Sequence, residues 1–106
     1  MDTAKINAWI MYALALASQK GAANFAEISQ IADGINHAIP THKELQSALK
    51  WLCNNLMVEK QGSGYVLTSK GSALVASTQD QNETTLKVWG ALEQTLALIM
   101  GNVQTE

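Results

Sequence analysis

Apolar residues recur along most of the chain at spacings of three and four positions, which is the period of an amphipathic α-helix. This pattern predicts helices over residues 3–19, 25–34, 41–55, 69–77 and 83–101. Between the third and fourth of these, residues 57–60 and 64–68 hold valine, tyrosine and leucine, which favour strands. The glycines of QGSG between the two stretches suit a tight connection. The sequence therefore predicts a mostly α fold with one small β-hairpin.

The first predicted helix has a wide apolar arc. Ile6, Ile10 and Leu14 lie on one face, and Trp9 and Tyr12 form part of an adjacent stripe. A helix with apolar residues over so much of its circumference is expected to contact more than one neighbour.

The run AWIMYALALA, residues 8–17, has two interpretations. The lysine before it and the ALAS at its end faintly resemble a secretory signal peptide. The helical spacing instead favours a buried first helix, and the run is too short to cross a bilayer. We expect the buried helix and no membrane partner. The single cysteine excludes an internal disulfide, and a cytoplasmic location is expected.

Two capping boxes indicate where the second and third helices begin. Asn24 is followed three residues later by Glu27, and Thr41 is followed by Glu44 at the same spacing. Such pairs satisfy backbone N–H groups at a helix N-terminus. Gly34 is expected near the end of the second helix, in a left-handed conformation. One coherent apolar face of the third helix contains Leu45, Ala48, Leu49, Leu52, Cys53 and Leu56.

The last part of the chain predicts a turn, a long helix and a dimer. Residues 77–83, STQDQNE, are polar and are expected to form the turn. The first and last helices both have wide apolar arcs, and only 15% of the residues are charged, against a usual share of about 25%. A homodimer would cover such a surface. The expected interface residues are Leu86, Trp89, Leu92, Leu96 and Ile99, in a stripe that continues to Val103. The alternative is that the two helices bury both faces within one chain.

Basic charge is sparse and unevenly placed. The chain has 106 residues, enough for one domain with a single core, and its formal net charge is −2. All seven basic residues are lysines. Residues 41–70 carry a net charge of +2, whereas the segments before and after them are negative. The positive charge therefore gathers on the third helix and the hairpin.

The order helix, helix, helix, hairpin, helix resembles that of the winged helix-turn-helix superfamily. FAEISQIADGI resembles the first helix of the helix-turn-helix, and THKELQSALKWLCNNLMVEK resembles the recognition helix with the first wing strand. GYVLTSKG resembles the returning strand and the threonine-capped helix start of small regulators of the PadR and MarR kind. The resemblance covers residues 3–78. It implies a winged-helix domain over residues 1–78 and a C-terminal dimerisation helix within residues 79–106, packed on the first helix.

The function that this resemblance implies is a DNA-binding transcriptional regulator. The recognition helix, about residues 41–55, would enter the major groove of double-stranded DNA, and the hairpin 57–68 would be the wing. Glutamine can pair there with adenine, and lysine with guanine. The expected DNA-binding residues are Thr41, His42, Lys43, Gln46, Ser47, Lys50, Lys60, Ser63 and Tyr65.

Two other interpretations of the third helix remain. Its polar face can be a solvated surface and nothing more. Alternatively, the chain is a winged-helix interaction module that does not bind DNA and contacts a protein partner through Trp51. Trp51 is more simply a core residue that packs under the wing or against the last helix, since tryptophan is highly buried on average.

Catalysis and metal binding are not expected. The chain contains no nucleophile elbow, P-loop, HExxH motif or dinucleotide fingerprint. His37, His42 and Cys53 match no common zinc spacing, so we expect no metal and no cofactor. A sensed ligand would have to bind between the first and last helices, beside Trp9 or Trp89.

Overall fold

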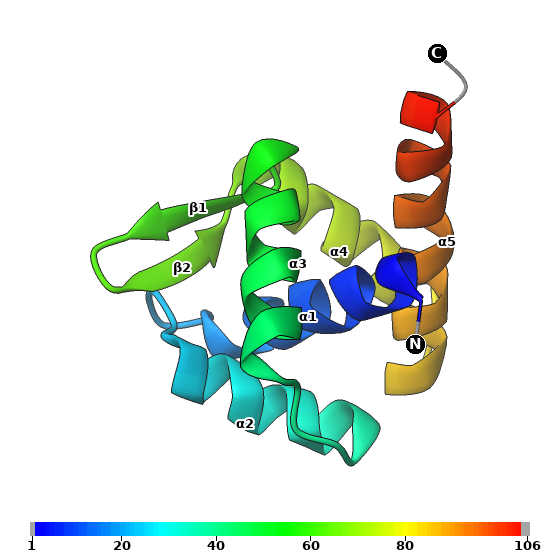
Figure 1. Cartoon of the computed structure of the whole chain (residues 1–106). Coiled ribbons are helices and arrows are strands. Elements are labelled where there is room, and N and C mark those ends of the chain that lie inside the picture. The colour runs from blue at the N-terminus through cyan, green and yellow to red at the C-terminus, as the bar shows by residue number, and fades with distance from the viewer. Residues whose placement is uncertain (1, 105–106) are drawn as a thin grey trace.

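The computed structural model describes residues 2–104, with side chains described as far as Gly101. Val103 belongs to the predicted stripe of the last helix, but its side chain lies outside the described part. Residues 105–106 of the predicted C-terminal segment also lie outside the described residues. The described part contains five helices and one antiparallel hairpin (Figure 1), so the mostly α class is confirmed. The elements are α1 (Thr3–Ala17), α2 (Phe25–Asn36), α3 (His42–Asn54), β1 (Val58–Gln61), β2 (Gly64–Leu67), α4 (Ser69–Gln81) and α5 (Thr85–Gln104).

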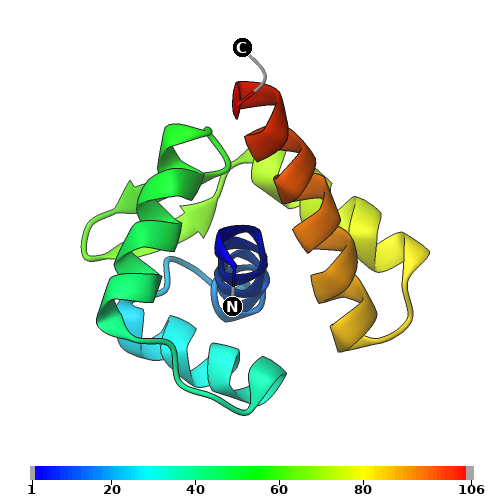
Figure 2. The same ribbon diagram turned by 45° about the vertical axis from the view of Figure 1, so that its right-hand side comes forward.

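Helix α1 is the centre of the molecule. Figure 2 looks almost along its axis and shows α2, α3 and α5 arranged around it. Residues 8–14 are all buried, which explains the wide apolar arc of this helix. A helix that is apolar on all sides belongs in a core rather than at a surface.

Two indole groups tie α1 to its neighbours. Trp9 Nε1 donates a hydrogen bond of 2.8 Å to the carbonyl of Ala32 in α2, and Trp89 Nε1 in α5 donates one of 2.9 Å to the carbonyl of Lys5. The two rings lie 6.2 Å apart between centroids. Both tryptophans are therefore buried structural residues whose polar atoms are satisfied.

Most of the main apolar stripe of helix α5 is buried against the rest of the chain. Trp89, Leu92 and Leu96 are buried, and α5 packs on α1 as the sequence predicted. Leu86 lies in the same predicted stripe but is 65% exposed. Leu98, on another face of the helix, is 70% exposed.

Helix α2 continues past the glycine that was expected near its end. It runs to Asn36, and the left-handed residue is His37, with φ of 55°. Continuation of the helix places Ile35 in the core, where it is only 6% exposed. Gly34 does lie near the end of the helix, but the predicted end at residue 34 and the left-handed conformation there were wrong. Burial of the next residue outweighed the local preference of glycine.

Helix α3 ends in a Schellman motif. The Met57 N–H donates to the Leu52 carbonyl at 3.0 Å, and the Leu56 N–H donates to the Cys53 carbonyl at 3.1 Å. Leu56 occupies the left-handed position that glycine usually takes, with φ of 62°. This conformation turns Leu56 out to 70% exposure, so its predicted place on the buried face was wrong.

The hairpin is anchored on both sides. Strand β2 pairs with β1 and also forms a bridge with the α1–α2 connection, where Ala23 and Tyr65 exchange two backbone hydrogen bonds of 3.0 and 2.9 Å. At the other end, Thr68 Oγ1 donates to the Leu56 carbonyl at 2.6 Å and accepts from the Gly71 N–H at 3.1 Å. The hairpin therefore has a fixed position beside the end of α3.

Helix α4 is longer than predicted. Residues 77–83 were expected to form a turn, but α4 extends to Gln81 and only residues 82–84 connect it to α5. Thr78 is buried in this extension, and its hydroxyl donates to the Val75 carbonyl at 2.8 Å. The polar composition of the segment reflects an exposed helix face rather than a turn.

No helix in the described range 2–104 has the length and apolar character required to cross a membrane.

Candidate nucleic-acid interface

The exposed face of α3 is polar over its first two turns and beyond. His42, Lys43, Gln46, Ser47 and Lys50 are all exposed, whereas Leu45, Ala48, Leu49 and Leu52 are buried on the opposite side. This division follows from the spacing of the leucines, which turns the polar residues between them toward solvent. Trp51, between Leu49 and Leu52, is half-buried and packs against the core. The Thr41–Glu44 capping box fixes the first turn, with bonds of 2.9 and 3.0 Å in the two directions.

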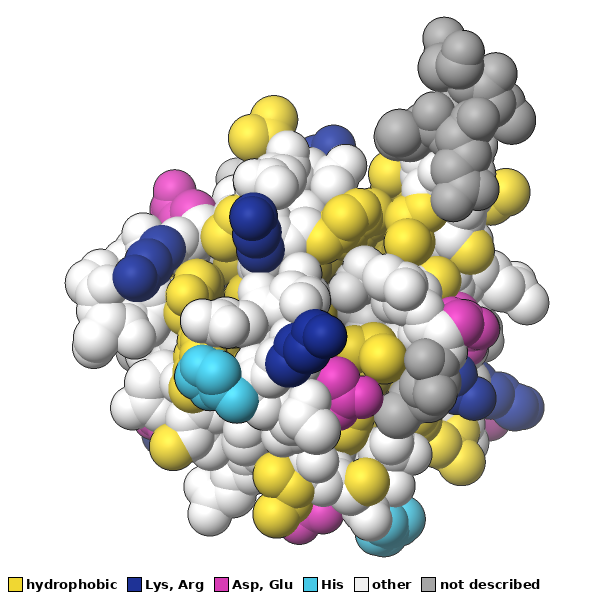
Figure 3. Space-filling view, viewed as in Figure 1, with side chains coloured by type: hydrophobic (Ala, Val, Ile, Leu, Met, Phe, Trp, Pro, Cys, Tyr) yellow, Lys and Arg dark blue, Asp and Glu magenta, His cyan; other side chains and the backbone are white. Residues whose placement is uncertain are grey.

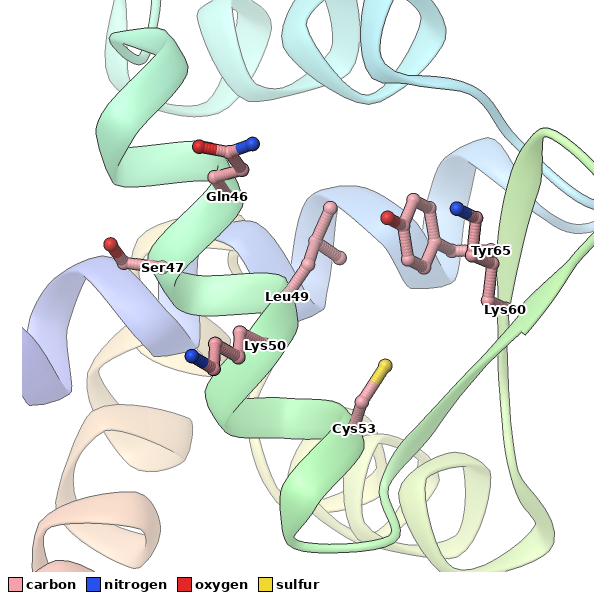
Figure 4. Close-up of a pocket in the computed structure, with 7 residues that line it drawn as sticks. All are labelled: Gln46, Ser47, Leu49, Lys50, Cys53, Lys60 and Tyr65. Atoms are coloured by element: carbon pink, nitrogen blue, oxygen red, sulfur yellow. The ribbon is translucent and has the colours of Figure 1, made fainter.

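A hollow of about 550 Å³ separates α3 from the hairpin. It brings together five of the nine predicted DNA-binding residues with Leu49 and Cys53 (Figure 4): Gln46, Ser47, Lys50, Lys60 and Tyr65. In Figure 4, Ser47 and Lys50 project from the side of α3 away from the hairpin, and Cys53 points toward the hairpin. The hollow is therefore a groove between helix and hairpin whose outer rim is polar and basic.

Tyr65 is held in place by other aromatic residues. Its ring stacks on Phe25 at 5.9 Å between centroids, and Phe25 lies 5.3 Å from the imidazole of His42. This row of rings joins β2 to the first turns of α2 and α3. Tyr65 is half-buried, so it positions the hairpin against the helices and also lines the groove.

The remaining predicted residues lie around the groove rather than in it. Thr41 and His42 are at the start of α3, and Ser63 is exposed at the hairpin tip next to Gly62, whose φ is 61°. Lys43 lies on the flank of α3 that faces α1, where it lines a separate, smaller hollow. The sequence did not show that α3 has two such flanks, because that depends on how α1 crosses it.

The local charges are mixed. Figure 3 shows lysine side chains distributed over α3 and the hairpin, with an acidic side chain close to each element. The acidic groups of this segment are Glu44, in the capping box, and Glu59, which accepts a bond of 3.2 Å from Gln61 Nε2. Lys70 Nζ donates to the Asn55 carbonyl at 3.2 Å, so it caps the end of α3 and is not available to the groove.

Cys53 is a half-buried thiol at the base of the groove. Burial raises the pKa of this thiol above its ordinary value. A thiol with a raised pKa remains protonated near neutral pH and is a poor nucleophile. Among the described residues, no three His, Cys, Asp or Glu side chains lie close enough together to hold a metal ion.

Between α1 and α5 the structure has a hollow of about 350 Å³ at the first turn of α1, lined by residues such as Asp2, Glu93 and Met100. Trp9 and Trp89, expected beside any ligand in this region, do not line it. Their indole N–H groups already bind backbone carbonyls.

Comparison with known proteins gives no relative for this chain: no family model, no curated protein and no solved structure matches it.

Proposed function

We propose that the chain is a winged-helix protein whose α3 binds in the major groove of double-stranded DNA, with the β1–β2 hairpin as the wing. The observation that carries this proposal is the exposed polar face of α3 beside a fixed hairpin. The helix N-terminus, where such proteins contact base edges, carries His42, Lys43 and Gln46. The order of the elements from α1 to α4 also agrees with a winged helix.

The number of available cations sets the expected strength of binding. Lys43, Lys50 and Lys60 are exposed on α3 and the hairpin, and the groove between these elements has no arginine. Each neutralised phosphate contributes a slope of about −0.9 to the dependence of log K on log salt concentration. Three contacts in one chain predict a slope of about −3, and a dimer about twice that. The binding is therefore expected to be moderate and strongly weakened by salt.

A salt-dependent mobility-shift assay on random duplex DNA tests the proposal. Lys50→Glu places a negative charge on the outer rim of the groove and is expected to weaken binding by about tenfold or more. The matched control is Lys87→Glu, which makes the same change of charge at an exposed position of α5. Absence of binding at low salt, or equal effects of the two substitutions, would contradict DNA binding by α3.

We also propose that two chains associate through the surface of α5 near its C-terminal end. Trp89, Leu92 and Leu96 were expected in the interface, but they are buried within one chain and offer no surface to a second. Leu98 is 70% exposed next to the half-buried Ile99 and Met100. Figures 1 and 2 show this end of α5 extending past the other helices. An exposed apolar cluster on a projecting helix is typical of an association surface.

Sedimentation equilibrium tests the dimer. The chain is expected to sediment as a dimer at micromolar concentration, and Leu98→Lys is expected to shift it to the monomer. Gln94→Lys, one turn earlier and also exposed, is the matched control. A monomer at high concentration, or a dimer that Leu98→Lys leaves intact, would contradict an interface at this end of α5.

A further inference from the structure

A second, smaller hollow lies between the N-terminal halves of α1 and α3. It measures about 180 Å³ and is bordered by three residues of α1 and four of α3: Thr3, Ile6, Asn7, Lys43, Glu44, Ser47 and Ala48. It lies on the flank of α3 that faces α1, and Ser47 is the one residue that it shares with the groove of the candidate DNA interface. No sequence motif pointed to it.

Asn7 is the unusual residue of this hollow. It is only 2% exposed, and its Nδ2 has no hydrogen-bond partner among the described residues. Buried amides are almost always paired, since an unpaired one costs stability. Asn7 is therefore an unsatisfied amide in the wall of the hollow. Its Nδ2 has almost no accessible surface, so a ligand can pair with it only when a neighbouring side chain of the wall moves.

The other walls indicate the chemistry of that ligand. Ile6 and Ala48 provide apolar surface, while Lys43 provides a cation at the exposed edge. The N-terminal turn of α3 also favours a negative group. Glu44 also lines the hollow and opposes an anion, although one oxygen of its carboxylate, Oε1, already accepts the Thr41 N–H at 2.9 Å.

The size of the hollow limits the ligand to a small molecule. A cavity of about 150 Å³ accommodates benzene, so 180 Å³ accommodates a body of about that size. A larger molecule would have to extend into solvent past Lys43. The body that fits best is a short branched or cyclic hydrocarbon group carrying one small polar group.

We propose that this hollow binds a short-chain apolar carboxylate, whose oxygen accepts from Asn7 Nδ2 and whose charge is paired with Lys43. The apolar body would lie against Ile6 and Ala48. Lys43 is also one of the cations expected to contact DNA phosphate, so the bound carboxylate would compete with DNA for it. This consequence for DNA rests on the proposed function, whereas the binding of the carboxylate does not.

The test is a titration of the isotopically labelled chain with isovalerate, followed by amide chemical shifts in the absence of DNA. Saturable shifts are expected at residues bordering the hollow, with a Kd of about 1–10 mM, as suits a few contacts of modest strength. Isovaleramide, which has the same shape and no charge, is expected to bind at least tenfold more weakly. Absence of saturable shifts, or equal binding of acid and amide, would overturn the proposal.

Two variants assign the contacts. Asn7→Leu replaces the unpaired amide with an apolar group of similar size, so it is expected to raise the melting temperature and abolish the isovalerate shifts. Lys43→Gln removes the charge at an exposed position, where folding is not at risk, and is expected to weaken isovalerate at least tenfold. Isovalerate binding that survives Lys43→Gln, or survives a folded Asn7→Leu, would show that the acid binds elsewhere.

A last experiment distinguishes failure of the carboxylate site from failure of DNA binding. Saturating isovalerate is expected to weaken duplex binding several-fold in the natural chain and to have no effect in Asn7→Leu, whose DNA contacts are intact. If isovalerate binds the hollow while no duplex binds at all, the proposed function fails and the carboxylate site stands. If duplex binds but isovalerate does not, the carboxylate site fails alone.

Discussion

Helices α1 and α3 illustrate two different uses of an amphipathic sequence. Residues 8–14 of α1 are all buried. The Trp9 indole of α1 donates to the Ala32 carbonyl, and the Trp89 indole of α5 donates to the Lys5 carbonyl of α1. Helix α3 buries its leucine face and leaves five polar side chains between residues 42 and 50 exposed. Substitutions around α1 should therefore change the free energy of unfolding, whereas those on the polar face of α3 should change binding and leave folding intact.

The largest effect is expected from Trp9→Ala. This change removes a side chain that is 1% exposed and the hydrogen bond to the Ala32 carbonyl. Loss of a buried tryptophan costs about 3–5 kcal/mol. Urea unfolding followed by circular dichroism measures the loss, and Trp9→Phe should cost less because it retains a ring. A loss of unfolding free energy below about 1 kcal/mol would contradict the central position of α1 in the core.

Gly71→Ala should destabilise the joint between α3, the hairpin and α4. A Cβ at this position would overlap the backbone carbonyl oxygen of Met57. Overpacking of this kind costs about 1–3 kcal/mol. Gly34→Ala is the matched control, since a Cβ there meets no atom within 4 Å and alanine is preferred in a helix by about 1 kcal/mol. The two substitutions should shift the urea midpoint in opposite directions, and a shift in the same direction would contradict the close approach at Gly71.

Leu56→Gly should stabilise the chain although it removes an apolar side chain. Leu56 is 70% exposed and has φ of 62°, a conformation that costs a non-glycine residue about 1–2 kcal/mol. Glycine relieves this strain but gives the unfolded chain more freedom, so a net gain of about 0.5–1 kcal/mol is expected. Thermal unfolding measures it. A net loss would mean that the leucine makes contacts beyond those of the isolated chain, for example with a partner.

The smallest effect is expected at Cys53, between the two faces of α3. Its raised pKa leaves less thiolate in the folded chain than in the unfolded chain at any pH below that raised value. Alkylation by iodoacetamide near pH 8 should therefore be several-fold slower in the folded chain than in urea. The two rates should converge as the pH rises through the folded pKa. Equal rates at pH 8 would contradict the burial of the thiol.

The sequence was sufficient for the elements whose buried face is regular. The leucine spacing and the Thr41–Glu44 box predicted α3 to within a residue or two, and the glycines of QGSG predicted the hairpin. Local signals failed where tertiary contacts decided the outcome. Helix α2 passes Gly34 because Ile35 is buried, and the polar end of α4 is a helix because Thr78 reaches the core.

The candidate sites were predictable to different degrees. The polar face of α3 followed from the helical period alone, since that period places Gln46, Ser47 and Lys50 away from the buried leucines. The sequence did not show that the lysines lie on two sides of α3. Lys43 lies beside α1, whereas Lys50 and Lys60 line the groove between α3 and the hairpin. Asn7 could have been noticed as an amide within an apolar arc. That it is unpaired depends on the packing of α1 against α3.

The central claim is that the chain binds DNA through α3 and the hairpin, and amide chemical shifts measured during titration with a short random duplex test it most directly. The account predicts shifts concentrated at residues 41–50 of α3 and at Lys60 and Ser63 of the hairpin, diminishing as salt is added. Shifts confined to α5, or no shifts at low salt, would contradict it.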